Sequence, residues 1–182
     1  MNKICSLIIG IGVFINLNAV EINHVYKKDN NNVYHLEGYF TDKSYDVIKN
    51  FLEKNKNKEI NIIPFSNGGS ANDIFRIQKL IKNHGKVNID TTLNGAYCYS
   101  ACASTFFISN NIKGKMYFHK LSARSVHNTF NQSVYYDNLA LKSILKNNGM
   151  SSELASRIIN KENGFIALNI NKNENKVFIK EL

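Results

Sequence analysis

The stretch Gly95-Ala96-Tyr97-Cys98-Tyr99-Ser100-Ala101-Cys102-Ala103 lies where a strand-like pattern changes into a helix-like one. Residues 87–93 alternate in the manner of a strand, and residues 101–108 are mostly apolar over a length that suits a short buried helix. A serine at the start of such a helix lies near unpaired backbone N–H groups and the positive end of the helix dipole. That environment stabilises the negative charge that forms when a hydroxyl attacks a carbonyl. Ser100 is therefore a candidate nucleophile, and the alternative is an ordinary helix N-cap.

Strand and helix patterns alternate along the rest of the chain. The expected strands are 33–40, 60–65, 87–93, 115–118 and 176–180, and the expected helices begin near 41 and 70 and cover 101–108, 135–146 and 151–160. In the helix 135–146 we expect Leu139, Ile144 and Leu145 to face the core. This order predicts an α/β fold with a largely parallel sheet and right-handed crossovers. In such sheets ligands bind outside the carboxyl ends of the strands, where both Gly68-Gly69 and Ser100 fall.

The chain of 182 residues is long enough for one stable core, and no linker in it indicates a second domain. Residues 1–19 indicate a signal peptide, with a short charged start, an apolar stretch and a cleavage site after Ala19. Residues 20–32 are polar and are expected to be flexible, and residues 33–182 are expected to form the domain. We therefore expect an exported protein, periplasmic or secreted, which contacts a membrane only through an uncleaved signal segment.

The distribution of charged residues and the spacing of motifs indicate which partners and cofactors are not expected. Lys and Arg total 23 against 14 Asp and Glu, for a net charge of +9, but the lysines are scattered among asparagines without interleaved aromatic residues. This pattern does not indicate a nucleic-acid interface. The histidines and cysteines lack the spacing of metal ligands, so we expect no metal. The Gly68-Gly69 turn lacks the lysine of a phosphate-binding loop, and no cofactor is expected.

Cys98 and Cys102 flank Ser100 and would remain after removal of the signal segment. In an oxidising compartment they could form a disulfide, provided that the turn between them bends suitably. Two buried thiols at the start of the helix are the alternative, and the sequence leaves both open.

Four segments in the same order resemble the ClpP/crotonase superfamily, most closely its exported ClpP-like serine peptidase branch. They are Leu36-Glu37-Gly38, Ser66-Asn67-Gly68-Gly69, Gly95 to Ala103, and Ser125-Val126-His127. The similarity extends over roughly Val33 to Phe165. It implies a single-domain fold of repeated ββα-type units with a largely parallel sheet, and relatives that assemble as rings or trimers. The sequence does not determine whether this chain forms a homo-oligomer.

The resemblance also implies a catalytic site. Ser100 matches the nucleophile, His127 the base, and the backbone N–H groups of Gly69 and Ala101 the oxyanion hole. The third member of the triad would be Glu162 or Asn163. Two features depart from the family pattern: Asn67 replaces a proline, and Gly95 lies one residue farther from the serine. The other histidines remain competitors for the role of the base: His24, His35, His84 and His119.

The leading hypothesis is an exported serine hydrolase that cleaves a peptide or protein substrate through an acyl-enzyme. A non-catalytic relative that keeps the fold as a binding or assembly module is the main alternative. Crotonase-like acyl-CoA chemistry is a third hypothesis, which export disfavours because coenzyme A is intracellular. A Ser–Lys dyad with Lys113 or Lys120 is a fourth.

Overall fold

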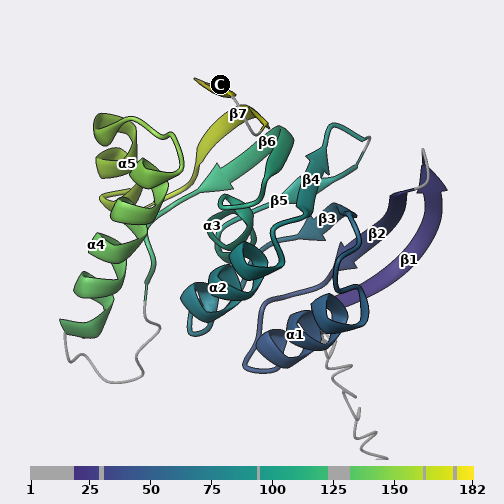
Figure 1. The fold of residues 1–182 in the computed structure, drawn as a ribbon. Helices are drawn as coiled ribbons and strands as arrows, with labels where there is room; N and C mark the ends of the chain where they lie inside the picture. Colours follow the sequence, from purple (N-terminus) through teal and green to yellow (C-terminus); the bar gives the residue numbers. More distant parts are fainter. Residues whose placement is uncertain (1–18, 29–30, 94, 123–131, 162, 174–175) are drawn as a thin grey trace, which may run out of the picture.

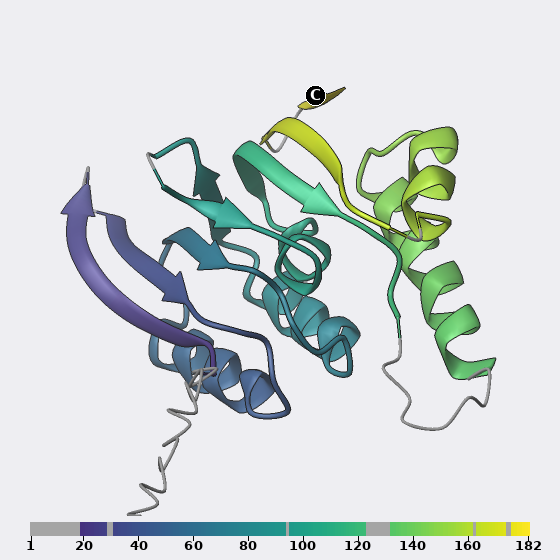
Figure 2. The same ribbon diagram turned by 180° about the vertical axis from the view of Figure 1, so that it is seen from behind.

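The computed structural model describes residues 19–28, 31–93, 95–122, 132–161, 163–173 and 176–182. In chain order the elements are β1 (Glu21–Lys28), β2 (Asn31–Glu37), α1 (Ser44–Lys54), β3 (Ile60–Ser66), α2 (Ile74–His84), β4 (Val87–Thr91), β5 (Tyr97–Cys98), α3 (Ala101–Phe106), β6 (Asn111–Phe118), α4 (Gln132–Asn147), α5 (Ser152–Ile159), β7 (Ile166–Asn173) and β8 (Lys176–Glu181). Figures 1 and 2 show helices α1 to α3 along one face of a twisted sheet, with α4 and α5 beside its β6–β7 end.

The described strands form one eight-stranded sheet in the order β1-β2-β3-β4-β6-β7-β8, with the short β5 paired to β3. The central strands β2, β3, β4 and β6 run parallel, and β5 is parallel to β3. Only the edges, β1 on one side and β7 and β8 on the other, add antiparallel pairs. The predicted single-domain α/β fold with a largely parallel sheet is therefore confirmed.

The core lies between the helices and one face of the sheet. Every helix contributes side chains to one buried cluster, which alternate residues of the strands complete: Ile48, Ile77, Phe106, Leu145 and Ile158 from the helices, and Leu36, Ile62, Ile89, Phe118 and Leu168 from the strands. The intervening strand residues, such as Phe65 on β3 and Tyr117 on β6, point away from this cluster because successive side chains of a strand alternate between faces. The sheet thus has one face packed by helices and a second face that the described helices leave uncovered.

The N-terminal segment differs from expectation. Residues 20–32, expected to be flexible, contain β1, which pairs antiparallel with β2 over most of its length. Most of its side chains are polar, and even its apolar residues Val25 and Tyr26 are exposed, so no buried alternation marks the strand. Backbone pairing with β2 defines it. Strand β7 was also not predicted, although Ile166, Leu168 and Ile170 alternate with more exposed residues as a half-buried strand requires.

The helices largely follow the sequence pattern. Gly85 ends α2 with φ +69°, and Ser151 caps α5, its Oγ accepting from Leu154 N at 3.2 Å. In α4 the prediction for Leu139 is wrong: this side chain is 40% exposed, whereas Leu141 and Leu145 are fully buried. Leu141 and Leu145 are one helical turn apart on one face, and Leu139 lies about 200° around the helix from Leu141. Among the described residues, no helix combines the length and the apolar character that crossing a membrane would require.

Candidate functional site

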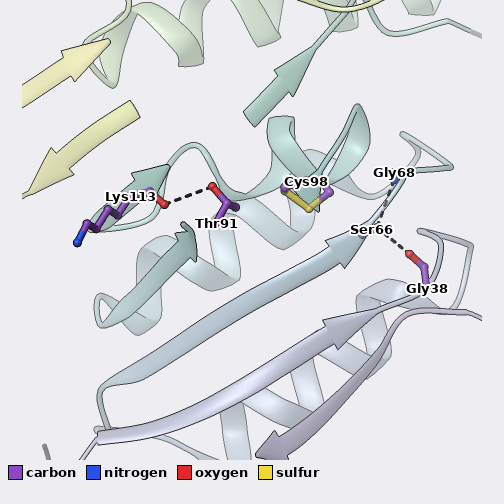
Figure 3. Close-up of a disulfide and its surroundings, with 7 residues drawn as sticks. Gly38, Ser66, Gly68, Thr91, Cys98 and Lys113 are labelled. Atoms are coloured by element: carbon purple, nitrogen blue, oxygen red, sulfur yellow. Dashed lines mark hydrogen bonds between the residues drawn. A yellow bond between two sulfur atoms is a disulfide. The ribbon is translucent and has the colours of Figure 1, made fainter. Parts of the chain in front are cut away.

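The turn after β3 is fixed by hydrogen bonds from Ser66. Its buried Oγ donates to Gly38 O at 2.7 Å and accepts from Gly68 N at 3.2 Å (Figure 3). Phe40 then pairs with the turn: Phe40 N donates to Gly68 O at 2.8 Å, and Ser70 N donates to Phe40 O at 2.7 Å. Because the flanking residues make both of these bonds, the N–H of Gly69 itself points to the opposite side. The Ser100 turn lies on that side, because β5, which leads into it, pairs with β3 on the side opposite to β2.

The two glycines let this turn pack directly against the Ser100 turn. Gly68 has φ +89°, and a Cβ atom on it would lie 2.6 Å from Tyr99 O and 2.9 Å from Ala101 N. Gly69 has φ +135°, and a Cβ atom on it would collide with the backbone of Phe40. Both positions therefore require glycine for conformation and for space. The predicted meeting of the two turns at the carboxyl ends of the strands is observed.

Ser100 occupies a sharp turn between β5 and α3. Its backbone has φ +53° and ψ −118°, a costly conformation for a residue with a side chain. Two hydrogen bonds hold it: Ser100 N donates to Tyr117 O at 2.8 Å, and Ser104 N donates to Ser100 O at 2.9 Å. The Ser100 side chain makes no capping hydrogen bond to α3. The side chain is therefore not used as an N-cap, and the strained strand–turn–helix resembles the kind of turn that can present a nucleophile.

His119 is the partner of that hydroxyl. Its Nε2 lies 2.6 Å from Ser100 Oγ. His119 directly follows β6, so it stands at the carboxyl edge of the sheet beside the Ser100 turn. Burial lowers the pKa of His119, and a hydrogen bond with the Lys120 backbone opposes this shift in part. A lowered pKa keeps the imidazole neutral near pH 7, and a neutral Nε2 can accept the serine proton.

Aromatic packing restricts the His119 ring. Phe165 packs edge-on against it with 5.0 Å between ring centroids, and against Tyr99 with 5.1 Å. Tyr99 in turn stacks on Tyr117 at 4.1 Å. Among the described residues, no acidic side chain contributes to the pKa shift of His119. In the described part of the site, the ring is thus held by the Lys120 backbone and by Phe165 rather than by a carboxylate.

The other predicted site residues fall in different places. His127 and Glu162 lie outside the described residues, so their assignments stay predictions. Asn163 is exposed, and no hydrogen bond joins it to His119 in the described structure. The remaining competing histidines lie elsewhere: His24 against Tyr34, His35 beside Glu37, and His84 against the backbone of Asn55.

The sequence carried a signal for His119 that the resemblance did not use. It is the first residue after the strand that follows the Ser100 helix, and it is therefore placed at the same edge of the sheet. Lys113, the alternative partner in a Ser–Lys dyad, lies four residues before Tyr117 on β6, roughly 13 Å away along the strand. Its carbonyl accepts from Thr91 Oγ1 at 3.3 Å (Figure 3).

Comparisons of the sequence match no family model and no curated protein. The fold, however, is similar to solved structures. A mutant of the 1510-N membrane-bound stomatin-specific protease superposes with a TM-score of 0.56 at 19% identity, over 74% of this chain and 70% of that one. ClpP1 from Listeria monocytogenes gives 0.58 at 15% identity, over 72% and 81%. A second 1510-N mutant, in complex with a substrate peptide, gives 0.56 at 20% identity, over 74% and 66%. The fold is ClpP-like.

A disulfide reinforces the serine turn of this ClpP-like fold. Cys98 and Cys102 are bonded, with 5.3 Å between their Cα atoms, and both are fully buried (Figure 3). The bond ties the last residue of β5 to the first turn of α3 across Ser100. Of the two alternatives that the sequence left open, the structure contains the disulfide. It restrains the backbone on both sides of the strained residue.

The chemistry available at this site is therefore that of a hydroxyl beside a neutral imidazole. Within the described ranges, no three His, Cys, Asp or Glu side chains gather closely enough to hold a metal ion. The site brings together Ser100, His119, and the turn that contains Gly69.

Proposed function

We propose that the protein is a serine hydrolase of the peptidase type, with Ser100 as the nucleophile and His119 as the general base. The observation that carries the proposal is the 2.6 Å contact between His119 Nε2 and Ser100 Oγ. Its support is the lowered pKa of His119, which leaves the ring able to take a proton near neutral pH. The strained backbone of Ser100 adds further support, because such strain concentrates at functional sites.

The reaction would proceed in two halves. His119 accepts the Ser100 proton as Oγ attacks the carbonyl carbon, and the imidazolium then donates this proton to the leaving amine. Water repeats the sequence on the acyl-enzyme, with His119 again as base, and releases the acid. The oxyanion of each tetrahedral intermediate would be bound by the N–H groups of Gly69 and Ala101. Two features support this role: Gly69 N–H points away from Phe40, and Ala101 begins α3.

A third residue is not required for this proposal. Glu162 and Asn163 remain predicted orienting residues, and His127 a predicted alternative base. We assign the orientation of His119 to its Lys120 backbone hydrogen bond and to the Phe165 ring.

The substrate class follows from the type of site and from the comparisons. The 1510-N neighbours are stomatin-specific proteases, and one of them was solved with a substrate peptide. A peptide or protein substrate is therefore the natural candidate for this chain. Assembly as a homo-oligomer also remains a prediction.

Export belongs to the same proposal. We assign residues 1–19 to a signal segment, and the Cys98–Cys102 disulfide supports an oxidising compartment, because disulfides persist there and are rare in a reducing cytosol. Sequencing the N-terminus of the protein isolated from its native host tests this assignment. A chain that begins at residue 20 and is recovered outside the cytoplasm is expected. Recovery of the intact N-terminus in the cytoplasm would contradict it.

A fluorophosphonate probe tests the hydrolase directly, since it labels only an activated serine. The folded protein should form one adduct, on the peptide that contains Ser100, and Ser100→Ala should abolish it. Ser70→Ala is the matched control, because Ser70 lies in the neighbouring turn and, within the described ranges, its Oγ accepts a hydrogen bond from Asn72 N and none joins it to Ser100 or His119. A well-folded sample that is not labelled would refute the hydrolase proposal and favour the non-catalytic binding module.

A further inference from the structure

Aromatic rings form a continuous row that ends at the proposed base. From His119 the contacts run to Phe165 at 5.0 Å, to Tyr99 at 5.1 Å, to Tyr97 at 5.9 Å and to Phe65 at 6.2 Å between ring centroids. Tyr117 stacks on Tyr99 beside this line. We call Phe65, Tyr97, Tyr99, Tyr117 and Phe165 the aromatic row.

The aromatic row lies on the face of the sheet that the described helices leave uncovered. Phe65 and Tyr97 are register partners on β3 and β5, and their neighbours Ser66 and Cys98 are fully buried on the helix side. Strand alternation therefore places the two rings on the opposite face. Tyr99 and Tyr117 are bridge partners on neighbouring segments. None of the five rings belongs to the buried core cluster, and Phe165 is 44% exposed.

A connected set of large, partly exposed rings is unusual on a protein surface and indicates a binding site. This set directly borders the Ser100–His119 pair. We propose that the aromatic row is the substrate-binding surface of the Ser100 site, and that it selects extended polypeptide segments with large apolar side chains. The inference rests on the hydrolase proposed above and specifies its substrate class.

The geometry of the row suits an extended chain. Successive centroids along Phe165, Tyr99, Tyr97 and Phe65 are 5.1, 5.9 and 6.2 Å apart. Side chains on one face of an extended peptide repeat at about 6.6 Å, close to the 5.9 Å between Tyr97 and Tyr99, which follow each other along one segment. Two alternate residues of a bound segment would therefore meet these two rings, and Phe165 and Phe65 flank them. A carbonyl held at Ser100 Oγ places the neighbouring residues of the same chain over the row, because Phe165 and Tyr99 adjoin the reacting pair.

The chemistry of the row explains the selectivity. Its members are phenylalanines and tyrosines, without a carboxylate or ammonium group, and burial raises the pKa of Tyr99 above its ordinary value. The row therefore offers no counter-ion to an acidic or basic substrate side chain. Its apolar faces favour phenylalanine, leucine and similar residues, with edge-to-face packing as an added contribution. Tyrosine hydroxyls can meanwhile donate to carbonyls of the bound backbone.

Peptide binding to the Ser100→Ala protein tests the inference without turnover. Two fluorescein-labelled octapeptides are compared by anisotropy: one alternates Phe or Leu with Ser, and the other replaces each Phe and Leu by Thr. The apolar peptide should bind at least about 10-fold more tightly, and Phe165→Ser or Tyr97→Ser should each weaken it about 10-fold. Phe178→Ser is the matched control, because Phe178 is a 64% exposed phenylalanine on β8, outside the row. It should leave the affinity unchanged.

The outcomes separate this inference from the proposed reaction. Equal binding of the two peptides, or equal affinities in the Phe165, Tyr97 and Phe178 variants, overturns the inference. So does a row variant that only dissociates an oligomer in sedimentation, since the row would then be a self-association face. Circular dichroism shows whether each variant is folded. Two independent row variants are used so that the test still stands if one of them fails to fold. If the fluorophosphonate does not label the wild-type protein but the apolar peptide still binds more tightly, the hydrolase proposal is refuted and the polypeptide-binding surface is supported.

Discussion

Gly68→Ala should separate the two turns that form the candidate site. The new Cβ would lie 2.6 Å from Tyr99 O and 2.9 Å from Ala101 N, both backbone atoms that cannot rotate aside. The positive φ of +89° adds strain for any residue with a side chain. Overpacking costs about 1–3 kcal/mol and left-handed strain about 1–2 kcal/mol. We therefore expect a loss of about 2–5 kcal/mol in the free energy of unfolding.

Gly85→Ala is the matched control. Gly85 has φ +69°, but the nearest atom that its Cβ would meet, Lys82 O, is 3.9 Å away. Only the conformational cost of about 1–2 kcal/mol remains there. Urea denaturation of both variants measures the difference, and fluorophosphonate labelling measures its effect on Ser100. Because a small displacement of reacting groups costs up to about 100-fold, labelling should slow about 10- to 100-fold in Gly68→Ala and stay unchanged in Gly85→Ala.

The contact between the two turns is what this comparison tests. Equal stability of the two alanine variants, together with equal labelling rates, would refute it. A Gly68→Ala protein that is destabilised but labels at the wild-type rate would show that the turn supports the fold and not the site.

Three further predictions concern individual groups. The rate of Ser100 labelling should fall on acidification with a midpoint below 6.5, the ordinary pKa of histidine, because burial lowers the pKa of His119 and only the neutral ring is a base; a midpoint at or above 6.5 would contradict this. Burial lowers the pKa of Lys172 from 10.5 to about 8, so between these pH values the unfolded chain binds a proton that the folded chain has lost. The free energy of unfolding of the wild type should therefore rise, relative to that of Lys172→Met, between about pH 8 and 10.5. Urea unfolding at several pH values checks this, and a constant difference would refute it. Reduction of the Cys98–Cys102 disulfide should slow labelling about 10-fold with the circular dichroism spectrum retained, because Ser100 loses a restraint; an unchanged rate would count against that role.

The fold could be predicted where patterns were strong. The apolar run at 60–65 and the glycine pair after it indicated a buried parallel strand with a turn at its carboxyl end, and β3 and its turn are there. The edge strand β1 could not be recognised, because its side chains are mostly polar and backbone pairing defines it. Polar composition in this position was mistaken for flexibility.

The site could be predicted only in part. Ser100 was identified because a strand-to-helix turn is a local feature of the sequence. Its partner depends on which strands are neighbours: β6 lies beside β4, and the bridge between Tyr99 and Tyr117 brings the end of β6 to the serine turn. Spacing along the chain does not specify that arrangement, so five histidines remained candidates. The sequence could not decide between a disulfide and two free thiols for a similar reason, since the bond depends on the bend at Ser100 rather than on the spacing of the cysteines.

The rate at which a fluorophosphonate labels Ser100 in His119→Ala and His127→Ala proteins tests the central claim most directly. Peptide mapping by mass spectrometry locates the adduct, and its growth with time gives the rate. If His119 is the base, His119→Ala should slow labelling by about 100-fold or more, whereas His127→Ala should stay within about threefold of the wild type. Rapid labelling in His119→Ala, combined with its loss in His127→Ala, would contradict the account.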